Sequence, residues 1–318
     1  MTRRPVREQF QFDWTDPQGR AFQLSLGRET VIMGVLNLTP DSFYDGGVYP
    51  TVEAAVSRAL EMESAGAGII DIGGESSRPG SRSVAAEEEL GRVIPVIESL
   101  APRLEIPISI DTCKAEIARR ALEAGARIIN DISALRLDPD LASVVADSFG
   151  PYIMMHMRGT PGTMQARPSY RDLLGEIKEF FRKRIEWAEG EGIARDRIII
   201  DPGIGFGKTL EHNLEIISGL PSLAELGRPI LIGPSRKSFI GSILGQEPDD
   251  RLWGTAGAVA ACIAHGAHII RVHDVHEMKD LAVVMDRVRL SGNRGIRRSG
   301  NQEIRGSGPE PAAKTALS

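Results

Sequence analysis

The stretch Arg197-Ile-Ile-Ile-Asp-Pro-Gly-Ile-Gly-Phe-Gly-Lys-Thr209 joins an apolar run to a glycine-rich loop. The β-branched run Arg197–Ile200 predicts a buried strand, and apolar residues spaced along 210–217 predict a helix with one apolar face. The loop between them begins with a carboxylate, Asp201, and continues with three alternating glycines. Glycines let a loop bend sharply and approach a ligand closely, so this unit predicts a ligand-binding loop after a strand.

The last residues of the loop, Gly207-Lys208-Thr209, are similar to the end of a phosphate-binding P-loop. That motif needs a further glycine five residues earlier, at the position that Pro202 occupies in this chain. The spacing therefore excludes a nucleotide phosphate loop. Lys208 is accordingly expected at a helix end or on the surface.

The same strand–loop–helix unit recurs along the chain and predicts the fold class. Apolar runs that predict strands lie at Val31–Leu36, Gly68–Ile72, Ile106–Ile110, Arg127–Ile129, Tyr152–Met155, Arg197–Ile200, Pro229–Ile232 and His268–Val272. Strands that alternate with helices form a parallel sheet, and continuously apolar strands are buried on both faces. Eight units favour an α/β (β/α)8 TIM barrel, while an open doubly wound sheet remains the alternative.

Flanking segments suggest three parts to the chain. Residues 1–29 are polar with scattered aromatic residues, which predicts an N-terminal extension or hairpin cap. Residues 30–290 carry the barrel. Residues 291–318 are rich in Ser, Gly, Arg and Pro without periodicity, which predicts a mostly disordered C-terminal tail.

Composition excludes several classes of protein. The 318 residues are 42% hydrophobic and 25% charged, which suffices for a globular core. A net charge of −5 gives no general polyanion-binding surface, so we expect no nucleic-acid partner. Two cysteines are too few for a disulfide framework or a zinc site and favour a reducing cytoplasm. We expect no membrane span, because no apolar stretch approaches about 18 residues.

Polar residues lie at the end of every predicted strand. They are Asn37, Asp71, Asp111, Asn130-Asp131, His156, Asp201, Ser235-Arg236-Lys237 and Arg271-Val-His273. Because the carboxyl ends of barrel strands meet at one mouth, these residues predict an active site there. Lys237, Arg271 and His273 can receive an anion, while Asp111 and Asp201 can accept from ring N–H groups or face a developing cation.

Two long loops are predicted to cover the mouth. Leu38–Pro50 and Gly73–Ser81 are rich in turn-forming residues and carry aromatic or charged side chains. Loops of this kind favour lids that exclude water, with ordinary surface connections as the alternative.

Several segments, in order, resemble the signatures of the dihydropteroate synthase family. They are Asn37-Leu-Thr-Pro-Asp-Ser-Phe43, Asp71-Ile-Gly-Gly-Glu-Ser-Ser-Arg-Pro-Gly80, Ile110-Asp-Thr112, Ile129-Asn-Asp131, Met155-His-Met157, Asp201-Pro-Gly-Ile-Gly-Phe-Gly207, Ser235-Arg-Lys237 and Arg271-Val-His273. The resemblance spans about Val31 to Leu290, nearly the whole predicted barrel.

This resemblance implies a pterin-binding (β/α)8 transferase of an alkyl group other than methyl. Such enzymes join p-aminobenzoate to 6-hydroxymethyl-7,8-dihydropterin pyrophosphate in folate biosynthesis and are targets of sulfonamides. It also implies Mg²⁺ as cofactor, a cytoplasmic homodimer and small-molecule substrates.

The resemblance also implies roles for individual residues. Asp111, Asn130, Asp201, Phe206 and Lys237 would hold the pterin, whereas Asn37, Arg271 and His273 would hold the pyrophosphate, with Mg²⁺ at Asn37. Phe43, Ser77, Arg78, Pro79 and Ser235 would frame the p-aminobenzoate site. The catalytic set would be Asp111, Lys237, Arg271 and His273.

The residue chemistry favours a dissociative path. Mg²⁺, Arg271 and an imidazolium at His273 could neutralise the departing pyrophosphate, and Asp111 could stabilise a cation on the pterin methylene. The aniline nitrogen of p-aminobenzoate is a poor nucleophile, and no general base is evident beside it. These features predict that the leaving group departs before attack.

Two alternative functions have distinguishable signatures. A pterin-binding methyltransferase would share Asp111, Asn130 and Asp201 but would not need the anion cluster or the two loops, which this chain has. A silent pterin-binding paralogue would be expected to lose some of these residues. Structural roles are expected for Cys113 and His156, and a solvated helix start is expected for Glu87–Glu89.

Overall fold

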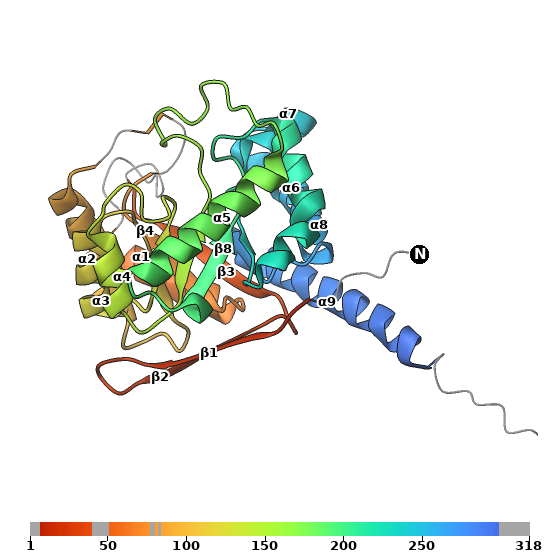
Figure 1. Cartoon of the computed structure of the whole chain (residues 1–318). Coiled ribbons are helices and arrows are strands. Elements are labelled where there is room, and N and C mark those ends of the chain that lie inside the picture. Colours follow the sequence, from red (N-terminus) through yellow and green to blue (C-terminus); the bar gives the residue numbers. More distant parts are fainter. Residues whose placement is uncertain (1–6, 40–50, 77–79, 82–83, 299–318) are drawn as a thin grey trace, which may run out of the picture.

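The computed structural model describes residues 7–39, 51–76, 80–81 and 84–298, and their main body is a barrel of parallel strands surrounded by helices (Figure 1). The strands are β1 (Phe10–Thr15), β2 (Ala21–Leu26), β3 (Val31–Asn37), β4 (Ile69–Gly73), β5 (Ile108–Asp111), β6 (Ile128–Asp131), β7 (Tyr152–Met155), β8 (Ile198–Asp201), β9 (Leu231–Ile232) and β10 (Ile269–Val272). The helices are α1 (Val52–Ser64), α2 (Ala86–Leu100), α3 (Ala115–Ala124), α4 (Leu141–Asp147), α5 (Leu173–Gly190), α6 (Leu210–Leu223), α7 (Ser238–Leu244), α8 (Leu252–Ala264) and α9 (Val275–Arg298).

The sheet closes on itself. Its strand order is β8-β7-β6-β5-β4-β3-β10-β9, with every neighbouring pair parallel. The two ends of this order meet where Ile200 forms a parallel bridge with Ile230, and the Ile200 N–H donates to the Pro229 carbonyl at 2.9 Å. The prediction of a (β/α)8 barrel over an open sheet is therefore confirmed.

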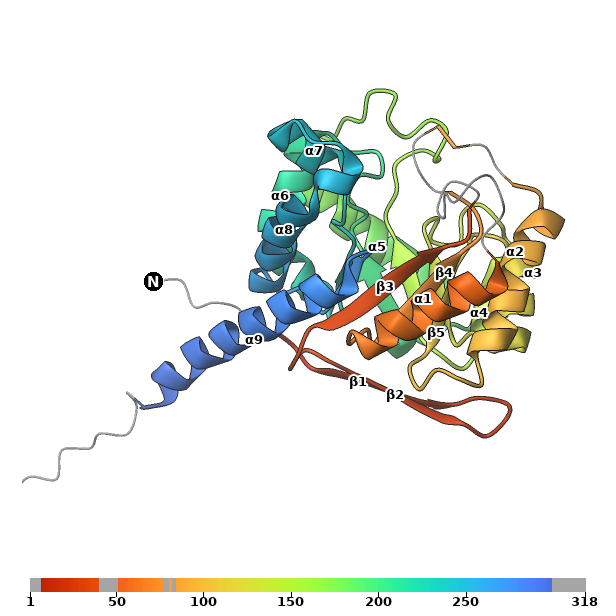
Figure 2. The same cartoon turned by 180° about the vertical axis from the view of Figure 1, so that it is seen from behind.

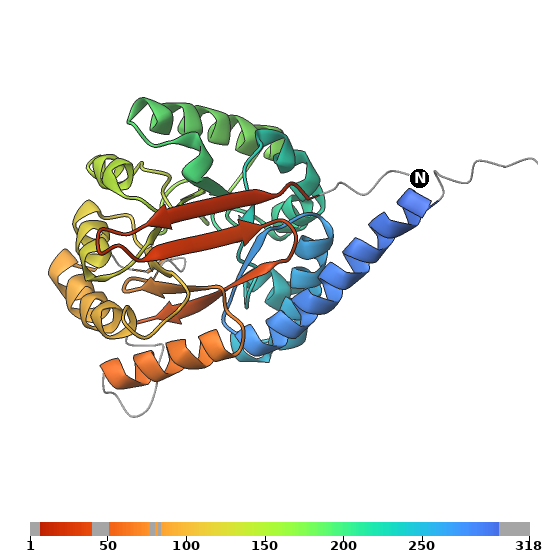
Figure 3. The same cartoon turned by 90° about the horizontal axis from the view of Figure 1, so that it is seen from below.

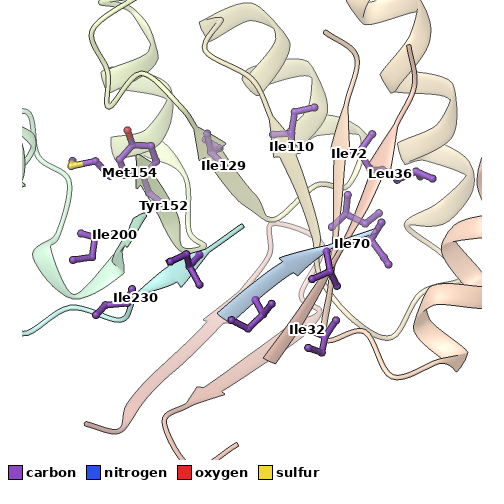
Figure 4. Close-up of a cluster of buried hydrophobic side chains, with 14 of the residues drawn as sticks. Ile32, Leu36, Ile70, Ile72, Ile110, Ile129, Tyr152, Met154, Ile200 and Ile230 are labelled. Atoms are coloured by element: carbon purple, nitrogen blue, oxygen red, sulfur yellow. The ribbon is translucent and has the colours of Figure 1, made fainter. Parts of the chain in front are cut away.

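Alternation along each strand divides its side chains between two cores. Ile32, Ile70 and Ile270 point outward and belong to the large cluster beneath the helices, part of which Figure 4 shows. Their neighbours Ile69 and Ile269 belong to a second cluster, inside the lower end of the barrel. This second cluster also contains Met33, Ile128, Ile153, Ile199 and Leu231.

The hairpin of β1 and β2 covers the lower end of the barrel, opposite the carboxyl ends of the strands (Figure 3). Phe12, Trp14 and Leu24 from its buried face pack into the cluster inside the barrel. The Trp14 and Phe22 rings stack with centroids 5.5 Å apart. The hairpin therefore supplies the apolar floor of the barrel.

Helix α9 is longer than the sequence predicts. It continues past the predicted boundary at Leu290 to Arg298 and projects beyond the barrel (Figure 2). The predicted tail is thus helical over 291–298, because extending an existing helix costs little compared with starting one. Among the residues described here, none of the helices combines the length and apolar composition of a membrane span.

Candidate active site

Inward positions near the carboxyl ends of the strands hold polar side chains instead of apolar ones. The side chains of Ile69, Ile128, Ile199 and Ile269 point into the barrel. The residues two positions later on the same strands are Asp71, Asn130, Asp201 and Arg271. The register aligns Asn37 with Gly73, Gly73 with Asp111, and Asp111 with Asn130 on successive strands. The period of two therefore brings five of the predicted residues, Asn37, Asp111, Asn130, Asp201 and Arg271, to one end of the barrel.

Arg271 on β10 is held by carboxylates from two other strands. Its Nε donates to Asp71 Oδ2 at 2.5 Å, and its Nη2 donates to Asp111 Oδ2 at 2.7 Å. Asn130 Nδ2 donates to the same Asp71 oxygen at 3.1 Å. One buried carboxylate thus orients both the cation and the amide of the predicted site.

Asp71 was predicted to lie at the mouth, but no role in a subsite was assigned to it. Its side chain is fully buried, and its Oδ1 has no hydrogen-bond partner among the described residues. The sequence did hold one signal: Asp71 stands two residues before Gly73 on β4, so the two residues share the inward face of the strand. Sequence could not show that its partner lies 200 residues away in the chain.

Burial and neighbouring charges set the pKa values of this cluster. Burial raises the pKa of Asp111, with Asp71 acting in the same direction and Arg271 opposing it. Burial would lower the pKa of Arg271, but Asp71 and Asp111 raise it above its ordinary value. Arg271 is therefore a permanent cation shared by two carboxylates.

The glycine loop after β8 turns tightly over Asp201. The Gly203 N–H donates to Asp201 Oδ1 at 2.7 Å, and the Phe206 N–H donates to the Gly203 carbonyl at 3.1 Å. Gly203 has a φ of 72°, and a Cβ there would lie 2.0 Å from the His156 carbonyl oxygen, so no other residue fits without a shift. Burial raises the pKa of Asp201 to about 6, although Gly203 and nearby lysines oppose this.

Phe206 and Lys237 meet beside this loop. The Lys237 Nζ lies 4.3 Å from the centroid of the Phe206 ring, a cation–π contact. Lys237 is the residue before α7, and its side chain also runs along Gly205, where a Cβ would lie 3.2 Å from its Cδ. The absence of a side chain at Gly205 therefore leaves room for the lysine.

Lys208 does not lie at the surface. It is 3% exposed, and its Nζ contacts His156 Nδ1 at 3.0 Å and the Phe206 carbonyl at 2.9 Å. Lys208 stands at a helix terminus as one alternative predicted, directly before the N-cap Thr209 of α6, but the surface alternative is wrong because the tight turn carries this side chain inward beneath the loop. His156, by contrast, has the expected structural position, buried with its ring 4.8 Å from that of Phe180.

Ser235 and His273 are paired at the end of the barrel. Ser235 Oγ lies 2.9 Å from His273 Nδ1, and the His273 N–H donates to Ser235 Oγ at 3.3 Å. Burial, followed by the nearby Arg271 cation, lowers the pKa of His273 to about 3. Burial thus favours a neutral imidazole, in contrast to the imidazolium that the sequence analysis expected beside the departing pyrophosphate.

The second loop is anchored at its described ends. Lys114 Nζ donates to Glu75 Oε2 at 2.6 Å, to the Val84 carbonyl at 2.6 Å and to Glu89 Oε2 at 2.7 Å. Glu89 is 1% exposed and also accepts from Thr112, so it is not the solvated helix residue that the sequence suggested. The predicted p-aminobenzoate residues Phe43, Ser77, Arg78 and Pro79 lie outside the described residues.

Cys113 has the structural character expected of it. Its side chain is partly buried against the cluster that contains Met155, Met157 and Phe206. Burial raises the pKa of its thiol well above the ordinary value, with Asp131 adding to the effect. A thiol that stays protonated is a poor nucleophile.

Comparison with known proteins agrees with this geometry. Residues 33–273 match the model of the family described as pterin binding enzyme. The dihydropteroate synthase of Synechocystis sp. is 50% identical over 261 residues, which cover 82% of this chain and 90% of the relative.

Solved structures give the same result. A Yersinia pestis dihydropteroate synthase in a sulfonamide drug complex superposes with a TM-score of 0.80 at 42% identity, covering 84% of this chain and 97% of that one. A Xanthomonas albilineans dihydropteroate synthase with 4-aminobenzoic acid gives 0.78 at 44% identity, covering 87% and 98%. With its barrel, its polar mouth and these likenesses, the chain belongs to the dihydropteroate synthases of the pterin-binding enzyme family.

Proposed function

We propose that the mouth of this barrel joins p-aminobenzoate to 6-hydroxymethyl-7,8-dihydropterin pyrophosphate, and that pyrophosphate departs before the new bond forms. The observation that carries the proposal is the ring of inward polar side chains, in which Arg271 bridges Asp71 and Asp111. This ring combines a permanent cation for a leaving anion with carboxylates for a developing cation. Family membership supports the same reaction.

The pterin subsite would consist of Asp111, Asn130, Asp201, Phe206 and Lys237. A flat, nitrogen-rich ring presents N–H groups that carboxylates accept, and Asn130 can both donate and accept. Phe206 would contact the ring, and Lys237, which lies over Phe206, would donate to its acceptor atoms. Desolvation strengthens each of these hydrogen bonds, because Asp201 is 7% exposed.

The pyrophosphate subsite would use Asn37, Arg271 and His273. Arg271 supplies the full positive charge, and the neutral imidazole of His273 acts as a hydrogen-bonding group. An arriving pyrophosphate competes with Asp71 and Asp111 for the guanidinium, so binding of the substrate loosens the contact that restrains Asp111. Asp111 is then available to face the pterin methylene.

Mg²⁺ suits this subsite through Asn37. The described residues contain no cluster of three or more His, Cys, Asp or Glu side chains that could hold a metal by themselves. An amide oxygen at the end of β3 fits an ion that keeps most of its water and takes its other ligands from substrate phosphates. When bound, Mg²⁺ supplies charge neutralisation for the pyrophosphate.

A dissociative path follows from the charges of the mouth. As the C–O bond to pyrophosphate breaks, positive charge develops on the pterin methylene, and the Asp111 carboxylate stabilises it electrostatically. The aniline nitrogen then attacks the methylene carbon and loses one proton to water or to the released pyrophosphate. Ser235, together with Phe43, Ser77, Arg78 and Pro79, would frame the p-aminobenzoate. The catalytic set is thus Asp111, Lys237, Arg271 and His273.

A homodimer and a cytoplasmic setting complete the proposal. Large apolar side chains on α7 and α8 are exposed, with Ile243 at 54%, Leu244 at 48% and Trp253 at 83%. A second copy of the chain would cover this surface, and Trp253→Glu should then shift the sedimentation coefficient to that of a monomer. Both cysteines are free thiols, as suits a reducing compartment.

Pyrophosphate release tests the reaction directly. Protein, Mg²⁺ and the pterin pyrophosphate should release pyrophosphate much faster when p-aminobenzoate is added, and a sulfonamide should compete with p-aminobenzoate. Asp111→Asn should lower kcat by about 100-fold or more, the size expected for losing one preorganised electrostatic group. Turnover that does not depend on p-aminobenzoate would refute the synthase function, and near-normal kcat in Asp111→Asn would refute the role of Asp111.

A further inference from the structure

Lys208 is a buried amine whose nitrogen meets three acceptors. Its Nζ lies 3.0 Å from His156 Nδ1, 3.3 Å from the His156 carbonyl oxygen and 2.9 Å from the Phe206 carbonyl oxygen. An ammonium group has three N–H bonds and no acceptor capacity, so three acceptors around it match its protonated form. A neutral amine would leave one of them without a donor.

The imidazole of His156 is suited to accept from this ammonium. Burial, followed by the adjacent Lys208 charge, lowers the pKa of His156 to about 2. The ring is therefore neutral, and Nδ1 can present its lone pair while Nε2 carries the hydrogen. Three aromatic rings, those of Tyr170, Phe180 and Phe181, surround the imidazole and fix its orientation.

The same amine links two segments that the proposed pterin subsite requires. His156 follows β7, whereas Phe206 belongs to the glycine loop that follows β8. Other contacts hold neighbouring points of this loop, since Gln165 donates to the Gly205 carbonyl at 2.6 Å and Tyr170 donates to the Gly207 carbonyl at 2.9 Å. Lys208 holds the carbonyl of Phe206 itself, between these two points.

We propose that Lys208 is a positioning residue for the pterin substrate, which fixes the backbone of Phe206 and so holds the Phe206 ring beneath Lys237. This inference rests on the proposed pterin subsite and adds a residue that touches no substrate. Burial lowers the pKa of Lys208 to about 7, with the Asp201 charge opposing that effect and the Lys237 charge adding to it. The three acceptors around Nζ stabilise the ammonium form against this lowering and favour a charged Lys208 at neutral pH. Because the side chain is also only 3% exposed, we assign it a positioning role and no proton transfer.

Lys208→Met tests the proposal, because methionine keeps an unbranched side chain only one atom shorter and removes the donors. Direct binding of 6-hydroxymethyl-7,8-dihydropterin pyrophosphate, without p-aminobenzoate, should weaken about tenfold or more, as expected for losing a charge-assisted hydrogen bond. The KM for p-aminobenzoate should change by less than about twofold, because the substitution removes no contact to that substrate. Lys183→Met is the matched control, since that lysine is 73% exposed and its loss should change neither constant.

A double-mutant cycle with Phe206→Leu separates positioning from general destabilisation. If Lys208 acts through Phe206, Lys208→Met should cost little further pterin affinity in the Phe206→Leu background. Equal losses in both backgrounds, or equal losses for both substrates, would overturn the proposal. Because pterin binding is measured without turnover, a failure here is distinct from a failure of the proposed reaction, which pyrophosphate release reports.

The wild-type protein provides a test that does not depend on a variant that folds. In protein labelled with ¹⁵N-histidine, His156 Nδ1 should show the shift of an unprotonated ring nitrogen that accepts a hydrogen bond at neutral pH. A protonated Nδ1 would mean that the imidazole donates to a neutral amine. That result would overturn the ammonium clamp.

Discussion

Replacing Asp71 tests whether the mouth depends on one buried carboxylate. Asp71 is fully buried and accepts from Arg271 Nε at 2.5 Å and from Asn130 Nδ2 at 3.1 Å. Asp71→Leu removes the oxygen to which both groups donate, and the negative charge. Asp71→Asn removes the charge but retains an oxygen that can accept from the same donors.

The structure sets the size of each effect. Removing one partner of a buried ion pair costs about 3–5 kcal/mol, and an orphaned amide donor adds about 1–3 kcal/mol. Asp111, 2.7 Å from Arg271, still compensates part of the guanidinium charge. We therefore expect Asp71→Leu to lower the free energy of unfolding by about 4 kcal/mol, the sum of the two low ends. Asp71→Asn should cost less, about 1–3 kcal/mol, because it keeps an acceptor for both donors and loses only a charge that Asp111 partly replaces.

Urea unfolding at pH 7 measures both values, provided that the m value is unchanged. Asp249→Leu is the matched control, because Asp249 pairs with Arg236 at 3.1 Å while 93% exposed, and such pairs contribute about 0–1 kcal/mol. Asp71 does not hold the mouth together if Asp71→Leu destabilises the protein no more than Asp249→Leu. The oxygen that Asp71→Asn retains does not accept from both donors if this variant is as costly as Asp71→Leu.

Two further predictions concern Asp201 and the floor of the barrel. The pKa of Asp201 is raised from 3.8 to about 6, so this carboxyl contributes stability at low pH that is lost as pH rises through 6. The stability of Asp201→Asn relative to wild type should therefore increase by up to about 3 kcal/mol as the pH is raised from 4 to 7. The KM of Asp201→Asn for the pterin substrate should rise. A difference in unfolding free energy between the two proteins that does not change with pH, measured in urea, would contradict this prediction. Trp14→Ala should cost about 3–5 kcal/mol of unfolding free energy with kcat unchanged, because Trp14 packs at the opposite end of the barrel from the mouth. A large loss of kcat in the folded Trp14→Ala protein would show that the floor and the mouth are coupled.

The barrel was predictable because parallel strands covered by helices must be continuously apolar. All eight predicted strands form, and polar side chains lie at or near their carboxyl ends because that end faces the mouth. The closing contact was not predictable, since Ile200 and Ile230 bridge through backbone groups that leave no mark in the side-chain pattern. Only the number of strand–loop–helix units indicated that the sheet closes into a barrel.

The candidate site was predictable as a set of positions and not as a set of partners. Asp111 and Arg271 were assigned to different subsites, yet they are hydrogen-bonded. Sequence spacing reports which strand end a residue occupies, whereas its protonation depends on what covers it. For that reason the neutral state of His273 and the burial of Lys208 and Glu89 emerged only from the three-dimensional arrangement.

The hairpin floor has a consequence for synthesis on the ribosome. Its apolar residues pack against side chains that run from Met33 on β3 to Ile269 on β10. About 240 residues separate Leu26 from Ile269, so at ordinary translation rates the first hairpin waits about 12 to 50 seconds for its last partner. During that interval the side chains of Phe12, Trp14 and Leu24 lack part of the apolar surface against which they pack in the folded protein. The nascent chain is therefore expected to need shielding at its very beginning, and chaperone contacts should map to the hairpin until β10 leaves the ribosome.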